Sequence, residues 1–227
     1  MAPIDDFATA ITDPAAPRLQ FDPATEPPRA LYHLMNSVVA PRPIAWVSTI
    51  SATGVANVAP HSYCMIVSAN PPIIAFSSTG AKDTLRNIQA TGEFVFNQVT
   101  EALVEAMNLT SADFPADTSE FDWAGLTAVP STVVRPPRVG ESPAALECRV
   151  LSIQEFGNDP SNLIIGQVVH LAVDPAFVTD GVLDLARVRP VARLMRNSYS
   201  RTRELYDIPR PTYQGLQAAG ATPKRQQ

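Results

Sequence analysis

The chain has 227 residues, of which 45% are hydrophobic, so it is long and apolar enough to form one large domain with a sizeable core. Its net charge of −5 and its dispersed basic residues argue against a nucleic-acid-binding face. The two cysteines, Cys64 and Cys148, lie far apart without CxxC spacing, which argues against a zinc site or a disulfide framework. Residues 1–28 lack a signal-peptide pattern, and the longest apolar segment, 163–173, is too short to span a bilayer. We therefore expect a soluble cytoplasmic protein.

The first half of the chain is expected to hold an arm followed by several strands. Frequent prolines predict an extended arm over residues 1–30, which is either disordered or lies over a partner subunit. Residues 31–39 are predicted to be a strand or a loop. Apolar, β-branched and aromatic residues predict strands at 44–50, 55–59, 63–67 and 73–77. Pro60 should end the second of these strands, and the last one, a continuous apolar run, is expected to be a central strand.

The second half mixes helices with longer strands. The patterns predict helices at 83–91 and 100–109, with Asp83 or Thr84 capping the first, and a strand at 93–99. Residues 111–140 are predicted to be irregular. Two long strands, 144–156 and 163–173, should form a hairpin. Many strands with only two convincing helices predict a mainly β fold, a barrel with helical additions, over residues 31–210, and a flexible tail over residues 211–227.

Polar residues gather where the predicted strands end. Trp46-Val47-Ser48-Thr49 and Pro60-His61-Ser62-Tyr63 combine donors and acceptors that could hold the polar edge of a planar heterocycle. Polar strand ends are common on any β domain, so ordinary strand and core roles for these residues are the alternative.

A second polar cluster opens the helix predicted at 83–91. The first N–H groups of a helix lack intrahelical partners and favour an anion, and Lys82 adds a full positive charge there. Ser77, Ser78 and Thr84 supply hydroxyl groups, so the cluster is a candidate phosphate site. A purely structural helix start is the alternative, because the chain has neither a GxxxxGK[ST] nor a GxGxxG motif.

Several of these segments together resemble the flavin reductase-like domain family, over roughly residues 30–200. The resemblance is carried by Pro41-Arg42-Pro43-Ile44-Ala45-Trp46-Val47-Ser48-Thr49, Gly54, Asn57, Pro60, Ser62, Tyr63, Asn70-Pro71-Pro72, Lys82-Asp83-Thr84, Asn87, and the segments 92–97 and 166–170. It implies an FMN-binding split β-barrel with a few peripheral helices. It also implies FMN held non-covalently at a homodimer interface.

The resemblance further implies roles for individual residues. Ser48 and Thr49 would line the isoalloxazine, while Asn57, His61, Ser62 and Tyr63 would lie near its pyrimidine edge and the ribityl chain. The phosphate would be bound by Ser77, Ser78, Lys82 and Thr84, with help from Arg42. Cys64 and Met65 follow Tyr63 at positions where family members vary, which leaves the substrate pocket open.

Residues late in the chain complete the expected site. The resemblance places His170 near the flavin, as a catalytic residue that positions the nicotinamide or protonates reduced flavin. A structural, hydrogen-bonded histidine is the alternative. Arg193, Arg196 and Tyr199 resemble the family's closing segment and would contact flavin or nicotinamide phosphates, unless they form a solvated basic face.

The leading functional hypothesis is an NAD(P)H-dependent flavin oxidoreductase, in which NADH or NADPH gives a hydride to flavin N5 and an oxygenase or another electron acceptor receives the electrons. The alternatives are a flavoredoxin-like electron carrier without fast reduction by NAD(P)H, and a non-redox flavin-binding protein. A serine hydrolase is disfavoured because the sequence has no GxSxG motif.

Overall fold

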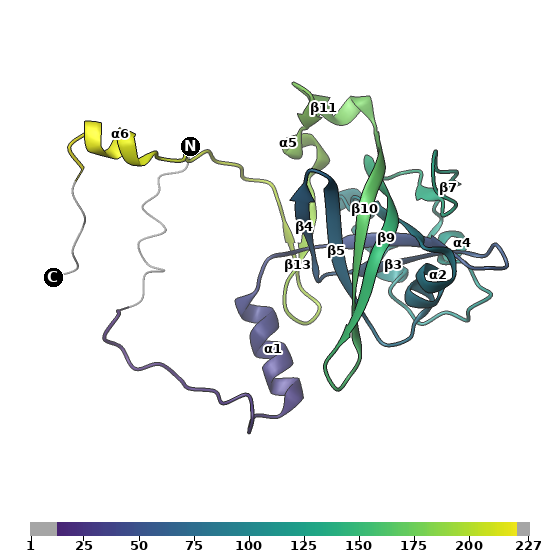
Figure 1. Cartoon of the computed structure of the whole chain (residues 1–227), viewed down its shortest axis with the longest axis horizontal. Coiled ribbons are helices and arrows are strands. Elements are labelled where there is room, and N and C mark those ends of the chain that lie inside the picture. Colours follow the sequence, from purple (N-terminus) through teal and green to yellow (C-terminus); the bar gives the residue numbers. More distant parts are fainter. Residues whose placement is uncertain (1–12, 222–227) are drawn as a thin grey trace. The chain divides into compact units, whose positions relative to one another are not determined.

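The computed structural model describes residues 13–221 (Figure 1), which fall into two separately packed units. The main unit spans residues 20–203, and the described residues of the other unit are 13–19 and 204–221. The described part of the smaller unit contains one helix, α6 (Tyr213–Ala218), inside the segment predicted to be a flexible tail. The boundaries 1–30, 31–210 and 211–227 stay predictions, and residues 1–12 of the predicted arm and 222–227 of the predicted tail lie outside the described residues.

A seven-stranded antiparallel sheet forms the main unit, in the order β3-β2-β6-β9-β10-β5-β4. Its strands are β2 (Ala45–Ile50), β3 (Ala56–His61), β4 (Cys64–Ala69), β5 (Pro72–Thr79), β6 (Glu93–Asn97), β9 (Ala144–Phe156) and β10 (Ser161–Val173). The predicted mainly β fold is confirmed. β3 continues through Pro60 to His61, because an edge strand tolerates a residue without an N–H group. β5 pairs with β10 on one side and with the edge strand β4 on the other, so it is an interior strand of the sheet, as predicted.

The long β9–β10 hairpin runs through the middle of the sheet (Figure 1). Its register shifts between Ile165 and Gly166, where the chain passes over the Phe94 ring. A Cβ at Gly166 would lie 2.5 Å from Phe94 Cε1, so only glycine allows this close approach.

Short helices surround the sheet. α1 (Pro28–Val38) covers most of the segment predicted to be a strand or loop, and Pro28 stands in its first turn, where a missing N–H is tolerated. α2 (Asp83–Thr91) has the predicted bounds and ends at Gly92, which has a φ of 70°. Neither Asp83 nor Thr84 caps α2, because its N-cap residue is Lys82 and no side chain makes a capping bond.

The predicted helix at 100–109 divides into the 3₁₀ helix η2 (Glu101–Leu103) and α3 (Val104–Leu109). The segment predicted to be irregular, 111–140, contains α4 (Glu120–Ala124), β7 (Ala128–Val129) and β8 (Arg138–Val139). The remaining elements are β1 (Arg42–Pro43), η3 (Pro175–Phe177), β11 (Val178–Thr179), β12 (Val182–Leu183), α5 (Leu185–Val188), β13 (Val191–Arg193) and β14 (Tyr199–Arg201). Between residues 13 and 221, no helix is long and apolar enough to cross a membrane.

Both faces of β2 are buried, in two different hydrophobic clusters. Ala45 and Val47 pack with Phe76, Phe94 and residues of α2, whereas Trp46 packs with Val58, Met107 and Phe121. Because side chains alternate along a strand, β2 separates the two clusters and fixes both α2 and the α3–α4 region against the sheet. These elements form the walls of the pocket described next.

Candidate functional site

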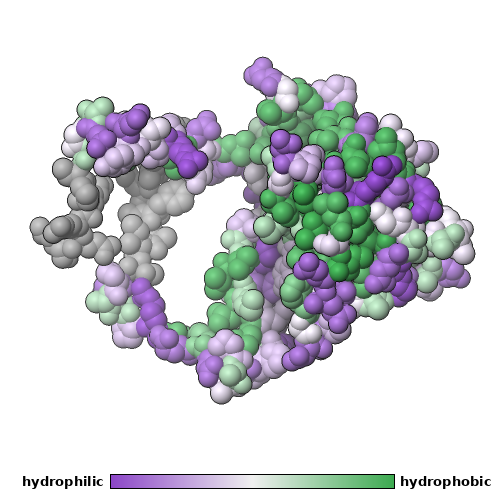
Figure 2. Space-filling view, in the orientation of Figure 1, coloured by the Kyte–Doolittle hydropathy of each residue, from purple (hydrophilic) through white to green (hydrophobic). Residues whose placement is uncertain are grey.

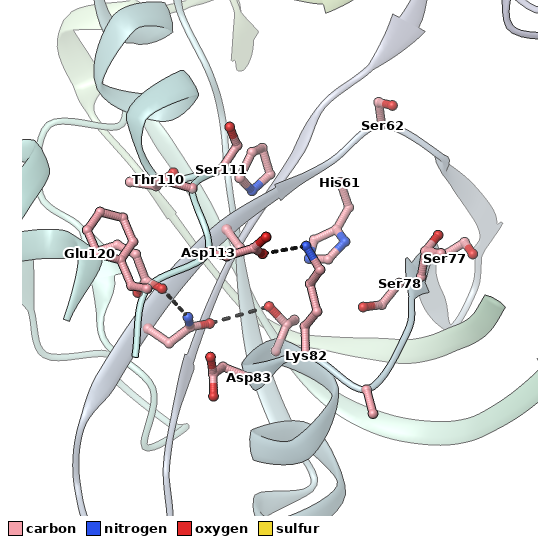
Figure 3. Close-up of a pocket in the computed structure, with 18 of the residues that line it drawn as sticks. His61, Ser62, Ser77, Ser78, Lys82, Asp83, Thr110, Ser111, Asp113 and Glu120 are labelled. Atoms are coloured by element: carbon pink, nitrogen blue, oxygen red, sulfur yellow. Dashed lines mark hydrogen bonds and ion pairs between the residues drawn. The ribbon is translucent and has the colours of Figure 1, made fainter. Parts of the chain in front are cut away.

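A pocket of about 500 Å³ opens where β3 and β5 end and α2 begins (Figure 3). Another wall comes from the loop after α3 and from α4. Eight of the predicted cofactor-binding residues line this pocket together: Asn57, His61, Ser62, Tyr63, Ser77, Ser78, Lys82 and Thr84. The fold thus brings both polar strand ends and the start of α2 into one cavity, although they are spread over 28 positions of the sequence (57 to 84).

One end of the pocket has the character of an anion site. The leading N–H groups of α2 have no partner within the helix because they stand at its start, and they carry partial positive charge. No side chain caps them. Lys82 stands at that helix end, and the buried Ser78 lines the same pocket. Among the described residues, Ser78 Oγ has no hydrogen-bond partner. A buried hydroxyl without a partner is unfavourable, and a ligand oxygen would satisfy it.

His61 presents a second unsatisfied polar atom to the pocket. Its Nε2 is buried and has no hydrogen-bond partner in the described part of the chain, and its ring lies 4.9 Å from that of Phe76. The pKa of His61 is lowered to about 4, mainly by burial; a hydrogen bond to the backbone of Ser77 opposes the shift, and the charge of Lys82 adds to it. At neutral pH the imidazole is therefore uncharged.

A network of buried polar side chains fixes another wall. Asn57 Nδ2 donates to Glu120 Oε1 over 2.7 Å, and the Val58 N–H donates to Glu120 Oε2 over 3.1 Å. Thr49 Oγ1 and Thr84 Oγ1 donate to Asn57 Oδ1 over 3.1 and 3.3 Å. Burial raises the pKa of Glu120 despite these bonds, and nearby Asp83 raises it further. The network ties α2 and α4 to β2 and β3.

Three of the predicted residues are buried outside the pocket lining. Ser48 donates from Oγ to the Pro137 carbonyl over 2.5 Å, and Thr49 belongs to the Asn57 network. Arg42 donates to three backbone carbonyls, those of Asn36, Val39 and Leu194, at 2.6 to 2.9 Å. In a single chain these contacts stabilise the fold, and the flavin contacts of these residues stay predictions.

His170 also lies away from the pocket. Its Nδ1 is 3.3 Å from Oε1 of the buried Glu147. Ser78 of the pocket pairs with Asn162 of β10, and His170 is eight positions further along that strand (170 − 162), roughly 26 Å at about 3.3 Å per residue. A single chain does not bring His170 into contact with the pocket. Its catalytic role stays a prediction.

The closing segment is held by its own contacts. The Arg193 guanidinium lies 4.6 Å from the centre of the Tyr199 ring, and Tyr199 OH donates to Asn108 Oδ1 over 2.9 Å. Neither residue lines the pocket, and their phosphate contacts stay predictions.

The pocket also uses residues that the sequence patterns did not single out. These are Tyr32 from α1, Arg86 from α2, the loop from Thr110 to Phe114, and Glu120 from α4. Ser119 before Glu120 and Gly125 after Ala124 form a helix start and stop signal, which could have revealed α4 within the segment 111–140.

Comparison with known proteins identifies the family. Residues 35–187 match the family described as flavin reductase like domain. The chain belongs to this family. Protein BH2278 of Halalkalibacterium halodurans, itself uncharacterized, is 43% identical over 190 residues, which cover 80% of this chain and 91% of that protein. The predicted family membership is thus confirmed.

Solved structures agree with this assignment. Nitrilotriacetate monooxygenase component B from Bacillus cereus has a TM-score of 0.82 and 33% identity, covering 86% of this chain and 100% of that one. A putative flavin reductase with a split barrel domain from Shewanella frigidimarina has a TM-score of 0.74 and 26% identity, with coverages of 86% and 100%. Flavoredoxin of Desulfovibrio vulgaris (Miyazaki F) has a TM-score of 0.68 and 26% identity, with coverages of 75% and 91%. The predicted split-barrel fold is confirmed.

Proposed function

We propose that this protein is an NAD(P)H-dependent flavin oxidoreductase that binds FMN non-covalently, with the phosphate at Lys82 and the start of α2. Membership of the flavin reductase-like family supports a flavin-related oxidoreductase function. The observation that carries the specific proposal is the pair of buried, unpartnered atoms, Ser78 Oγ and His61 Nε2, in the same pocket as Lys82.

The residues present fit such a ligand. A volume of about 500 Å³ lies within the range of pockets that hold small ligands and cofactors. A phosphate would be held by Lys82, the free N–H groups of α2 and the hydroxyl of Ser78, whereas Thr84 would first have to release the hydrogen bond that it donates to Asn57. Neutral His61 would offer a polar atom to an uncharged part of the ligand without adding charge to the site.

The protein's contribution is to bind and orient the reactants. Bound FMN would supply the redox chemistry, accepting a hydride from NADH or NADPH at flavin N5. The Asn57–Glu120 network keeps α2 fixed against β3, which holds the phosphate end of the pocket in one place. Ser48, Thr49 and His170 would take part if the isoalloxazine reaches beyond the pocket of a single chain.

A homodimer is part of the proposal. Exposed apolar side chains on α1 (Tyr32, Met35 and Val38) and on β4 (Met65, Ile66 and Val67) support it, because a monomer rarely leaves so many exposed together. Figure 2 shows further hydrophobic side chains gathered over the sheet of the main unit. The likeness to a monooxygenase component supports an oxygenase as the electron-accepting partner.

The likeness to flavoredoxin favours a second candidate, an electron carrier that NAD(P)H reduces slowly. Anaerobic addition of NADH or NADPH to the purified protein with FMN separates the two candidates. Loss of flavin absorbance within seconds supports the oxidoreductase and identifies the preferred nicotinamide. A bound flavin that stays oxidised supports the carrier or a non-redox binding protein, and an absence of flavin binding contradicts all of them.

A further inference from the structure

Carboxylates already pair with the cations at the proposed phosphate end of the pocket. Lys82 Nζ donates to Asp113 Oδ1 over 2.7 Å, and Arg86 pairs with Asp83. Figure 3 shows the Lys82 and Asp113 side chains meeting across the pocket. Asp113 belongs to the loop after α3, 31 residues further along the chain, so this ion pair joins two separate walls of the pocket.

The loop that carries Asp113 is anchored on both sides of it. Thr110 is buried, accepts a hydrogen bond from Trp46 Nε1 over 2.9 Å, and donates to the Met107 carbonyl over 2.7 Å. On the other side, the Phe114 ring lies 5.6 Å from the ring of Trp123. Asp113 itself is exposed between these anchors, so its side chain can leave Lys82 by rotating while the loop stays in place.

The Asp113 carboxylate and a ligand phosphate would both bind the ammonium group of Lys82. The hydrogen bond from Lys82 lowers the pKa of Asp113, which is therefore ionised at neutral pH. A second anion at Lys82 would be repelled by the Asp113 carboxylate and would have to share the donors of Lys82 with it. A ligand without a phosphate does not meet this competition.

We propose that Asp113 competes with the ligand phosphate for Lys82 and thereby sets how readily a phosphorylated flavin leaves the pocket. The inference rests on the proposed function and deepens it. On this proposal FMN binds reversibly and exchanges with free FMN, because the Asp113 carboxylate takes the place of the phosphate at Lys82 as the ligand dissociates. Asp113 is thus a determinant of affinity that acts on the phosphate and not on the ring.

The test compares FMN with riboflavin in fluorescence titrations and stopped-flow dissociation. D113N should bind FMN about threefold to fivefold more tightly than wild type, the range of an exposed ion pair, and release it more slowly, with riboflavin binding unchanged. D117N is the matched control, because Asp117 is an exposed aspartate in the same segment and does not line the pocket. In a K82A background, the gain from D113N should largely disappear.

Failures of the inference and of the proposed function are distinguishable. A wild-type protein that binds FMN, with a D113N variant that binds it no more tightly, overturns the competition and leaves the FMN site intact. An equal gain for riboflavin or for D117N overturns it as well, because the effect would then not depend on the phosphate or on Lys82. A wild-type protein that binds neither flavin removes the proposed function and this inference together.

Discussion

Glu120 at the pocket and Glu147 beside His170 are both buried glutamates, but their carboxylates differ in the hydrogen bonds that they accept. Glu147 accepts hydrogen bonds from the N–H groups of Thr132 and Val133 at 2.8 and 2.7 Å. Burial opposes its ionisation, but these bonds and the nearby His170 outweigh burial, so the pKa of Glu147 is lowered. Glu120 has fewer backbone donors and lies near Asp83, so burial dominates and its pKa is raised.

The two glutamates therefore have different surroundings. Glu147 holds the segment around residue 132 against β9, and each of its two oxygens accepts a backbone N–H group, although the neighbouring His170 Nδ1 has no hydrogen-bond partner among the described residues. Glu120 borders a pocket that also contains the unpartnered Ser78 Oγ and His61 Nε2. Incomplete polar satisfaction and a raised carboxyl pKa at one place are typical of a ligand site.

The largest expected effect contrasts the two glutamates directly. E147Q should lower the free energy of unfolding by about 3 kcal/mol at pH 7, because a charged acceptor of two backbone N–H groups is lost. E120Q should cost only about 1 kcal/mol, since burial already disfavours the charge there. Urea unfolding of wild type and both variants measures the loss of unfolding free energy in each variant. Equal losses would contradict the distinction between the regions.

The next effect concerns His61 and pH. Its pKa in the folded protein is about 4, below the ordinary value of 6.5, so the unfolded chain binds more protons between these values. The contribution of His61 to stability should therefore fall as the pH falls, by about 2 kcal/mol from pH 8 to pH 5.

H61Q isolates this contribution, because a neutral side chain of similar size cannot titrate. Urea unfolding of wild type and H61Q at pH 8 and pH 5 should show wild type losing about 2 kcal/mol more than the variant on acidification. A pH-independent difference between the two proteins would mean that His61 is as accessible to protons in the folded state as in the unfolded chain.

Much of the fold could be predicted from the sequence because local patterns and tertiary packing agree. The alternating and β-branched residues of 44–50 and 144–156 form strands within about one residue of the predicted limits. The helix α1 (Pro28–Val38) was missed because its first turn contains proline and its outward face is apolar. Tyr32, Met35 and Val38 are exposed, so the usual polar outer face of a helix is absent.

The candidate site could be predicted only in part. Residues at strand ends and at the start of α2 are clear from local sequence, and eight of them do meet in one pocket. Asp113 and Glu120 reach that pocket from the segment 111–140, which has no long periodic pattern. Their roles depend on contacts with Lys82 and Asn57, 31 and 63 residues away in sequence, which only the folded chain reveals.

The central claim is that Lys82 and the start of α2 bind a flavin phosphate, and paired titrations of FMN and riboflavin test it most directly. K82A should weaken FMN binding about tenfold, or ~1.4 kcal/mol, and leave riboflavin binding nearly unchanged. R149A is the matched control, because the Arg149 side chain is about as exposed (59% against 62%) and does not line the pocket. An equal loss of FMN and riboflavin affinity in K82A would contradict the claim.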